Sequence, residues 1–159
     1  MNANAHKSHF EFVGSRIVNV EINHTYIAMD INNSKSREFE LHHEIGEIFE
    51  NGEKQFGNIK LMVDVHVENK NNSEDYYTFK MTIEGCFSVE KSFPVEQFKE
   101  MLRINGSAAL YSIARGFILG VSAQTMFNGQ IVLPLLNFTD MPNQSTESQA
   151  ETEELNPEC

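Results

Sequence analysis

Two-residue alternation of apolar side chains is the feature of this 159-residue sequence that most restricts its fold. In IKLMVDVHVEN (residues 59–69) and YYTFKMTIEGCFSV (76–89), apolar residues return at every second position. Successive side chains of a β-strand point to opposite faces of a sheet, so both runs predict long strands with one buried and one wetter face. The polar stretch NKNNSED (69–75) between them predicts that the two strands form a hairpin.

Two further strands are predicted before residue 90. FEFVGSRIVNVEIN (10–23) alternates on both sides of Gly14, which indicates a bulge or bend at that glycine. REFELHHEIGEIF (37–49) lies between the loop-like stretches NNSKS and NGEKQFGN and predicts the remaining strand. The first part of the chain therefore predicts four antiparallel strands.

After Pro94 the apolar period changes to that of a helix. PVEQFKEMLR (94–103) predicts a short helix, with the proline at a favourable first position. Asn105-Gly106 predicts a break, and Ser107 is expected to cap a second helix that runs to about Met126. Strands followed by helices and an extended tail predict an α+β domain, with helices on one face of an antiparallel sheet.

The second predicted helix is apolar nearly all round, with its polar side chains Ser112, Arg115 and Ser122 on one strip. Small residues recur along it at spacings of three and four: Ala109, Ser112, Gly116, Gly120 and Ala123. Glycine inside a helix costs about 1 kcal/mol relative to alanine, so this file of small residues indicates a packing role. It would serve either close packing on the chain's own sheet or contact with the same helix of another subunit, and we predict the second, in a homo-oligomer.

The stretch GFILGVSAQTMFNGQIVLPLLNFT (116–139) carries no charge, in a chain with 23 acidic and 12 basic residues. A membrane span needs roughly 20 mostly apolar residues in one helix. Gln124, Asn128 and Pro134 divide this run into a helix-like half and a strand-like half, so no membrane insertion is expected. The net charge of −11 argues against a nucleic-acid partner, because phosphate binding needs a basic surface.

No catalytic motif appears in the sequence, and we expect neither an enzyme nor a metal or cofactor site. His42 and His43 are adjacent, so in a strand they point to opposite faces; we interpret the histidines as surface residues. Cys86 has no neighbouring lysine or arginine to lower its pKa, which predicts a buried, inert thiol. It and Cys159 are expected to be free thiols. The N-terminus has no apolar signal segment, which predicts a cytoplasmic protein.

The order of elements after residue 85 resembles the bacterial export chaperone SecB and its SecB-like relatives. The sequence GCFSV is followed by the short amphipathic helix, then by YSIARGFILGVSAQTMFNG and IVLPLLNF. LPLLNF (133–138) is the most specific match, and FVGSRIVNVEI resembles the first strand of the family. The resemblance predicts a flexible N-terminus over 1–9, a SecB-like chaperone domain over 10–141 and a disordered acidic tail over 142–159.

The resemblance implies a sheet with helices on one face, assembled as a dimer of dimers (a homotetramer). Such chaperones hold unfolded polypeptides in apolar grooves without ATP and pass secretory precursors to the SecA motor, while some relatives protect an antitoxin. The expected polypeptide-binding residues are Phe10, Phe12, Phe127, Leu133, Leu135, Leu136 and Phe138. A structural adaptor that has lost client binding is the alternative of a different class.

The sequence departs from the family at three points. A proline and polar, acidic residues (142–159) follow LPLLNF, where the family continues into an amphipathic helix. Glu21 falls near one acidic position used for motor docking, but Lys80, with Thr78 nearby, stands where another acid is expected. The acidic tail either supplies docking charge or only improves solubility.

Overall fold

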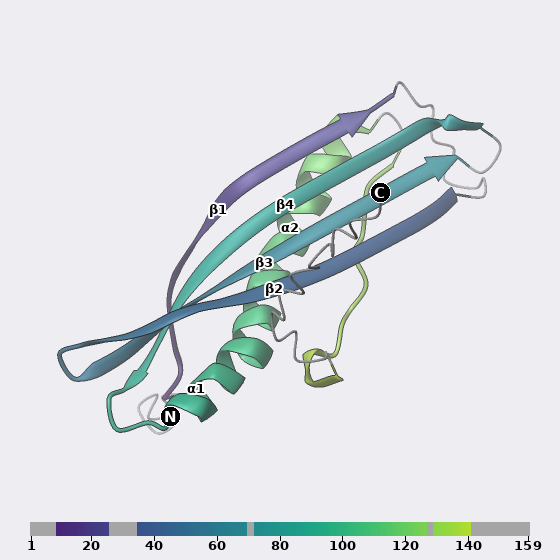
Figure 1. Ribbon diagram of the computed structural model, residues 1–159. Coiled ribbons are helices and arrows are strands. Elements are labelled where there is room, and N and C mark those ends of the chain that lie inside the picture. The colour runs from purple at the N-terminus through teal and green to yellow at the C-terminus, as the bar shows by residue number, and fades with distance from the viewer. Residues whose placement is uncertain (1–8, 26–34, 70–71, 127–128, 141–159) are drawn as a thin grey trace, which may run out of the picture.

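The computed structural model describes residues 9–25, 35–69, 72–126 and 129–140. Its core is one antiparallel sheet in the order β1-β4-β3-β2 (Figure 1). The strands are β1 (Glu11–His24), β2 (Lys35–Asn51), β3 (Lys54–Asn69) and β4 (Asn72–Glu90). The four predicted strands and the antiparallel pairing of β3 with β4 are therefore confirmed.

One face of the sheet carries the core. Burial alternates along β3 and β4, so that Leu61, Val63, Phe79 and Ile83 are almost completely buried. Their neighbours on the other face are partly exposed, as the two-residue period predicted. The helical part of the chain packs on the apolar face of these two long central strands, which therefore determine where the helices lie (Figure 1).

The predicted irregularity at Gly14 is confirmed, because the pairing of β1 with β4 slips by one residue between Phe12 and Gly14. A second slip in β1 occurs between Ile17 and Asn19. An extra residue in one strand locally disrupts the ladder and turns side chains out of the regular alternation. Both slips lie in β1, which forms one edge of the sheet.

The helical region differs from the prediction at its centre. Helix α1 (Val95–Met101) continues through a π-helical stretch, η2 (Leu102–Gly106), into α2 (Ser107–Thr125). The predicted break at Asn105-Gly106 is wrong, since Gly106 has helical dihedral angles of −62° and −49°. An added Cβ at Gly106 would lie 3.2 Å from Cγ2 of Ile59, so this glycine permits close packing on the sheet.

Ser107 does not cap α2, and that prediction is also wrong. Its side chain is completely buried, and its Oγ has no hydrogen-bond partner within the described part of the chain. Ser122 does not share the exposed strip of Ser112 either, because it is buried and accepts a hydrogen bond from the backbone of Ile131. The polar positions of α2 thus divide between its two faces.

The small-residue file of α2 faces away from the sheet. Its exposed members are Ser112, Gly116, Gly120 and Ala123. An added Cβ at either glycine would meet no atom within 4 Å. The opposite side of the helix packs on the sheet through Leu110, Ala114 and Ile118. Packing of the file on the chain's own sheet, one of the two predicted arrangements, therefore does not occur.

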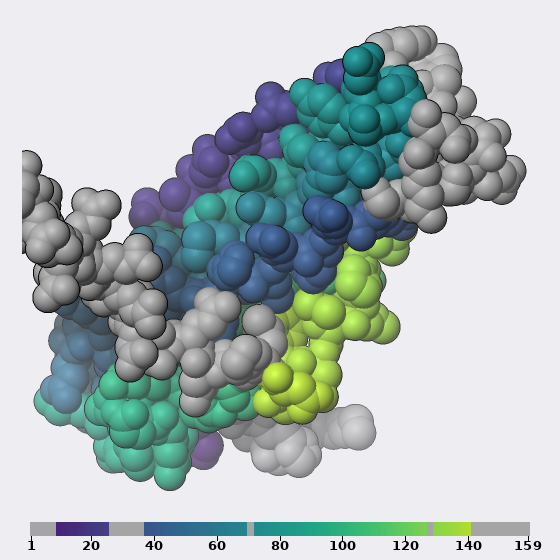
Figure 2. Space-filling model, turned by 45° about the vertical axis from the view of Figure 1, so that its right-hand side comes forward, coloured from purple at the N-terminus to yellow at the C-terminus, as the bar shows by residue number. Residues whose placement is uncertain are grey.

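After α2 the chain returns in extended form alongside the helix and ends in the short 3-10 helix η3 (Phe138–Asp140) (Figure 1). We call residues 129–140 the return segment. It reaches the surface beside β2 as the yellow-green band of Figure 2. The charge-free run of the sequence is thus divided between the second half of α2 and this segment.

Candidate polypeptide-binding surface

The return segment is held by helix side chains that bind its backbone. Ser122 Oγ accepts a hydrogen bond from the N–H of Ile131 at 2.8 Å. Arg115 Nε donates to the carbonyl of Leu133 at 3.1 Å, and Tyr111 donates its hydroxyl to the carbonyl of Pro134 at 2.8 Å. Arg103, in η2, donates to the carbonyl of Phe138 at 3.4 Å. All four contacts reach main-chain atoms of the segment, so none of them depends on its side chains.

The side chains of the return segment divide between the core and the surface. Ile131, Leu133 and Phe138 are buried, whereas Val132 and Leu135 are 53% and 84% exposed. The Phe138 ring lies 5.5 Å from Tyr111, which in turn lies 6.1 Å from Phe39. The segment is therefore layered against α2 and linked through aromatic rings to β2.

The predicted polypeptide-binding residues fall into two groups. Phe10 and Phe12 surround Phe87 at the beginning of β1, with ring centroids 4.8 and 5.2 Å away. The others lie in the return segment, apart from Phe127, which is outside the described residues. The first group lies at the edge strand β1, whereas the second is linked through Tyr111 of α2 to Phe39 of β2, the opposite edge strand.

Individual exposure differs widely among these residues. Leu135 and Phe12 are exposed, Phe10 and Leu136 are half-buried, and Leu133 and Phe138 are buried within the single chain. Exposed apolar side chains that the sequence analysis did not select are Val13, Ile17, Val18, Phe49, Val95, Ile113, Leu119 and Val132. The strand periodicity around Gly14 indicated a bulge but not which side chains it would turn outward.

Three of these additional residues are exposed on the edge strand β1: Val13 and Val18 lie at its two register slips, and Ile17 lies opposite the buried Ile83. Solvent-exposed edge strands are normally protected by charges or prolines, because their free backbone groups invite pairing. Contiguous exposed apolar surface usually marks an interaction site. Among the described residues, several exposed apolar side chains therefore lie on the β1 edge and in the region of α2 and the return segment.

The face of the sheet away from α2 is polar and locally charge-balanced. Glu21 is exposed and lies opposite Lys80 in the β1–β4 ladder. Lys80 Nζ also lies 3.6 Å from a carboxylate oxygen of Asp64 on β3. Arg16 and Glu84 form a further cross-strand pair at 2.7 Å. The lysine noted in the sequence thus stands between two acidic residues of neighbouring strands.

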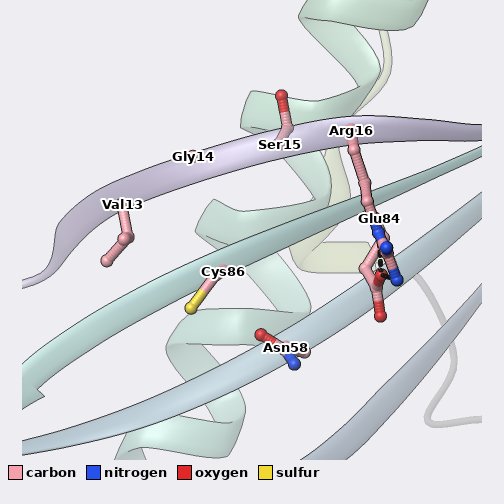
Figure 3. Close-up of a pocket in the computed structure, with 7 residues that line it drawn as sticks. All are labelled: Val13, Gly14, Ser15, Arg16, Asn58, Glu84 and Cys86. Carbon is pink, nitrogen blue, oxygen red and sulfur yellow. Dashed lines mark hydrogen bonds and ion pairs between the residues drawn. The ribbon is translucent and has the colours of Figure 1, made fainter.

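A hollow of about 410 Å³ lies on this same face, in front of the strands in Figure 3. It is lined by Val13, Gly14, Ser15, Arg16, Asn58, Glu84 and Cys86. The predicted full burial of Cys86 is wrong, since the thiol is half-buried in this hollow. Desolvation, and secondarily Glu84, raise the pKa of Cys86, which favours the protonated thiol.

His42 and His43 point to opposite faces as predicted, but the interpretation of His43 as a surface residue is wrong. Its side chain is buried, and its Nδ1 has no hydrogen-bond partner within the described residues. Burial, and to a smaller extent Arg103 and His42, lower the pKa of His43, so the ring is neutral. Arg103 is itself paired with Glu100, at 2.9 Å from its Nε.

The described residues contain no cluster of three or more His, Cys, Asp or Glu side chains arranged to hold a metal ion. Among the same residues, no helix combines the length and the apolar character that crossing a bilayer demands.

Of the comparisons with known proteins, the one with solved structures gives a match. Neither protein-family models nor curated protein sequences match the chain. Among solved structures, it is similar to the Mycobacterium tuberculosis SecB-like chaperone Rv1957, determined in complex with a ChAD peptide from the HigA1 antitoxin Rv1956. The TM-score is 0.64 at 12% identity, over 80% of this chain and 91% of the other. The chain therefore has the SecB-like fold, and the predicted fold class is confirmed.

Proposed function

We propose that this protein is an ATP-independent holdase, which binds unfolded polypeptide through apolar surface and keeps it from aggregating. The observation that carries the proposal is the exposure of large apolar side chains on a SecB-like fold, above all Leu135 and Val132 on the return segment. Ile113 and Leu119 are further exposed apolar side chains, on the helix to which the segment is bonded.

The expected affinity follows from the area that such a surface offers. Burying about 600 Å² of apolar client surface contributes roughly 15 kcal/mol in gross terms. Ordering and immobilising an unfolded client cancels much of this, which leaves an affinity between micromolar and nanomolar. With a net charge of −11, the subunit favours apolar client segments flanked by basic residues, and salt weakens only the charge-dependent part.

We propose assembly into a homo-oligomer, a dimer of dimers, through the small-residue file of α2. Ser112, Gly116, Gly120 and Ala123 present little side-chain bulk on the outward face, and Ala109, the remaining member of the file, is half-buried. Such a face lets two helix backbones approach closely. It also explains why an exposed helix face retains two glycines that cost it stability.

Two client systems are consistent with the fold: secretory precursors destined for the Sec pathway in the cytoplasm, or a dedicated antitoxin. The outer face of the sheet favours the second. Docking to the SecA motor would use acidic residues there, including Glu21, but Lys80 faces Glu21 and lies near Asp64. A charge-balanced surface attracts a basic partner less than a uniformly acidic one does.

Suppression of aggregation of an unrelated, slowly folding protein tests the holdase proposal. Leu135→Asp places a charge on the most exposed apolar side chain and should weaken protection about tenfold, since it removes roughly 1.5 kcal/mol of apolar contact. Gln130→Asp is the matched control, because it adds the same charge at an exposed polar position of the same segment. If the intact wild-type protein holds no unfolded chain, the adaptor alternative replaces the holdase.

A further inference from the structure

We propose that the hollow on the outer face of the sheet is a docking site for an arginine side chain of a partner protein, whose guanidinium group binds Glu84. The inference goes beyond the holdase function, because the hollow lies on the face of the sheet away from α2 (Figure 3). Its support comes from the small residues that form the hollow, from a carboxylate oxygen left without a partner, and from the opening of the hollow to the surface.

The hollow exists because three small residues are in register across neighbouring strands. Gly14 of β1 pairs with Cys86 of β4, and Cys86 pairs with Asn58 of β3. A Cβ added at Gly14 would meet no atom within 4 Å, so nothing covers this position. Val13, at the register slip beside Gly14, also lines the hollow and gives it an apolar wall. The resulting volume is about 410 Å³.

Glu84 lines the hollow with a carboxylate that is only half used. Arg16 reaches it from β1 and places both Nε and Nη2 on the same oxygen, Oε2, at 2.8 and 2.7 Å (Figure 3). The other oxygen, Oε1, has no hydrogen bond or ion pair with any residue that the structure describes, including Lys60 opposite it on β3. Only 17% of the Glu84 side chain is exposed, so water solvates this charge poorly. The free oxygen therefore favours a charged donor.

The chemistry of the lining favours arginine as that donor. The Asn58 amide oxygen and the Ser15 hydroxyl add acceptors beside Glu84. A guanidinium group has five N–H donors in a planar fork and can reach a carboxylate and a neighbouring acceptor together, which the compact ammonium of lysine does less well. The aliphatic stem of the arginine would pack on Val13. A carboxylate has about four lone-pair sites, so Arg16 does not exclude a second guanidinium.

The openness of the hollow favours a partner protein over a free small molecule. Val13 is 56% exposed and the Arg16 side chain 76% exposed, so the rim faces solvent. Sites for small ligands bury most of the ligand surface, and this hollow is too open to do so. A side chain held in place by further contacts of a protein surface does not need that enclosure. Binding here depends on short hydrogen bonds to one carboxylate, so it needs no uniformly acidic face around it.

The thiol of Cys86 reports occupancy of the hollow, because it lies in the lining. In the Cys159→Ser variant, alkylation of Cys86 by iodoacetamide at about pH 8.5 is measured with and without a peptide. The probe is N-acetyl-Gly-Arg-Gly amide, and its control contains citrulline, which has a similar shape and no charge. The arginine peptide should slow alkylation, with a half-effective concentration about tenfold below that of the citrulline peptide.

Two variants change this affinity in opposite directions. Glu84→Gln should weaken protection by the arginine peptide about tenfold, because it removes the charged acceptor. Arg16→Gln should strengthen protection, because it frees Oε2 and removes a like charge. Glu44→Gln and Lys80→Gln are the matched controls, since they make the same charge changes on the same face of the sheet without lining the hollow. Both should stay within about twofold of the wild type.

Each variant is compared with itself in the absence of peptide, because Glu84 also affects the thiol of Cys86. Circular dichroism confirms that the variants are folded. Equal protection by the arginine and citrulline peptides overturns the inference, and so does an equal effect of Glu84→Gln and Glu44→Gln. Failure of the wild type to hold an unfolded client overturns only the holdase function, since that assay does not involve this face.

Discussion

Replacement of Gly116 or Gly120 by leucine should change the stability of the folded subunit and the stability of its assembly in opposite directions. Beyond the neighbouring residues and the backbone of α2 itself, neither glycine has an atom within 4 Å of the position that a Cβ would occupy, so the isolated subunit has room for a larger side chain. Leucine is preferred over glycine in a helix by roughly 0.8 kcal/mol. The variant subunit should therefore gain that amount, equivalent to a rise of about 2 °C in its melting temperature.

The assembly should respond in the opposite direction. If the small-residue file is the contact between subunits, two helix axes approach there within about 8 Å, and a leucine at the contact forces them apart. Gly116→Leu and Gly120→Leu should each split the oligomer into smaller species. Gly116→Ala is the graded control, because a methyl group keeps the file small and should preserve assembly while still stabilising the helix.

Light scattering coupled to size exclusion measures the mass, and urea unfolding at two protein concentrations measures the stability. The wild-type midpoint should rise with concentration, as for any oligomer that unfolds to monomers, and that of the leucine variants should not. A wild-type mass near the 18.1 kDa of one subunit would refute the reasoning. So would a leucine variant that keeps the wild-type mass.

Two further outcomes are expected. The double variant Cys86→Ala, Cys159→Ser should keep its oligomeric state and client binding, because Cys86 is a protonated, half-buried thiol; bound zinc that is lost with either cysteine would contradict this. His43 is buried and its pKa is lowered in the folded state, so the unfolded chain binds more protons than the folded one below about pH 6.5. Stability should thus fall as pH drops below that value, and urea unfolding at pH 7.5 and pH 5 should show a smaller loss for His43→Gln; an equal loss would show that other groups dominate.

Several elements followed directly from local sequence. The alternation in β3 and β4 specified both the strands and their buried face, because side-chain direction in a strand depends only on position. Gly14 marked the slip in β1 for a similarly local reason. The change of period after Pro94 located the helices, and the order of these elements was sufficient for the α+β class.

Other features depended on contacts between residues far apart in the sequence. Gly106 reads locally as a helix breaker, but its role is set by Ile59 and Phe87, which approach it across the sheet. His43 reads as a surface residue, but it is buried on the face of β2 that adjoins the helical layer and Arg103. In both cases a long-range contact overrides the local preference, and the partner cannot be identified from neighbouring residues.

The charge-free run shows the same division. Its composition determined that residues 116–139 would be shielded from water or used for binding, since so much uncharged apolar surface is costly to leave exposed. Only the tertiary structure decided that Leu133 enters the core while Leu135, two residues later, is exposed. The physical reason is that hydrogen bonds from Arg115 and Tyr111 determine the path of the segment, and those donors belong to a different element of the fold.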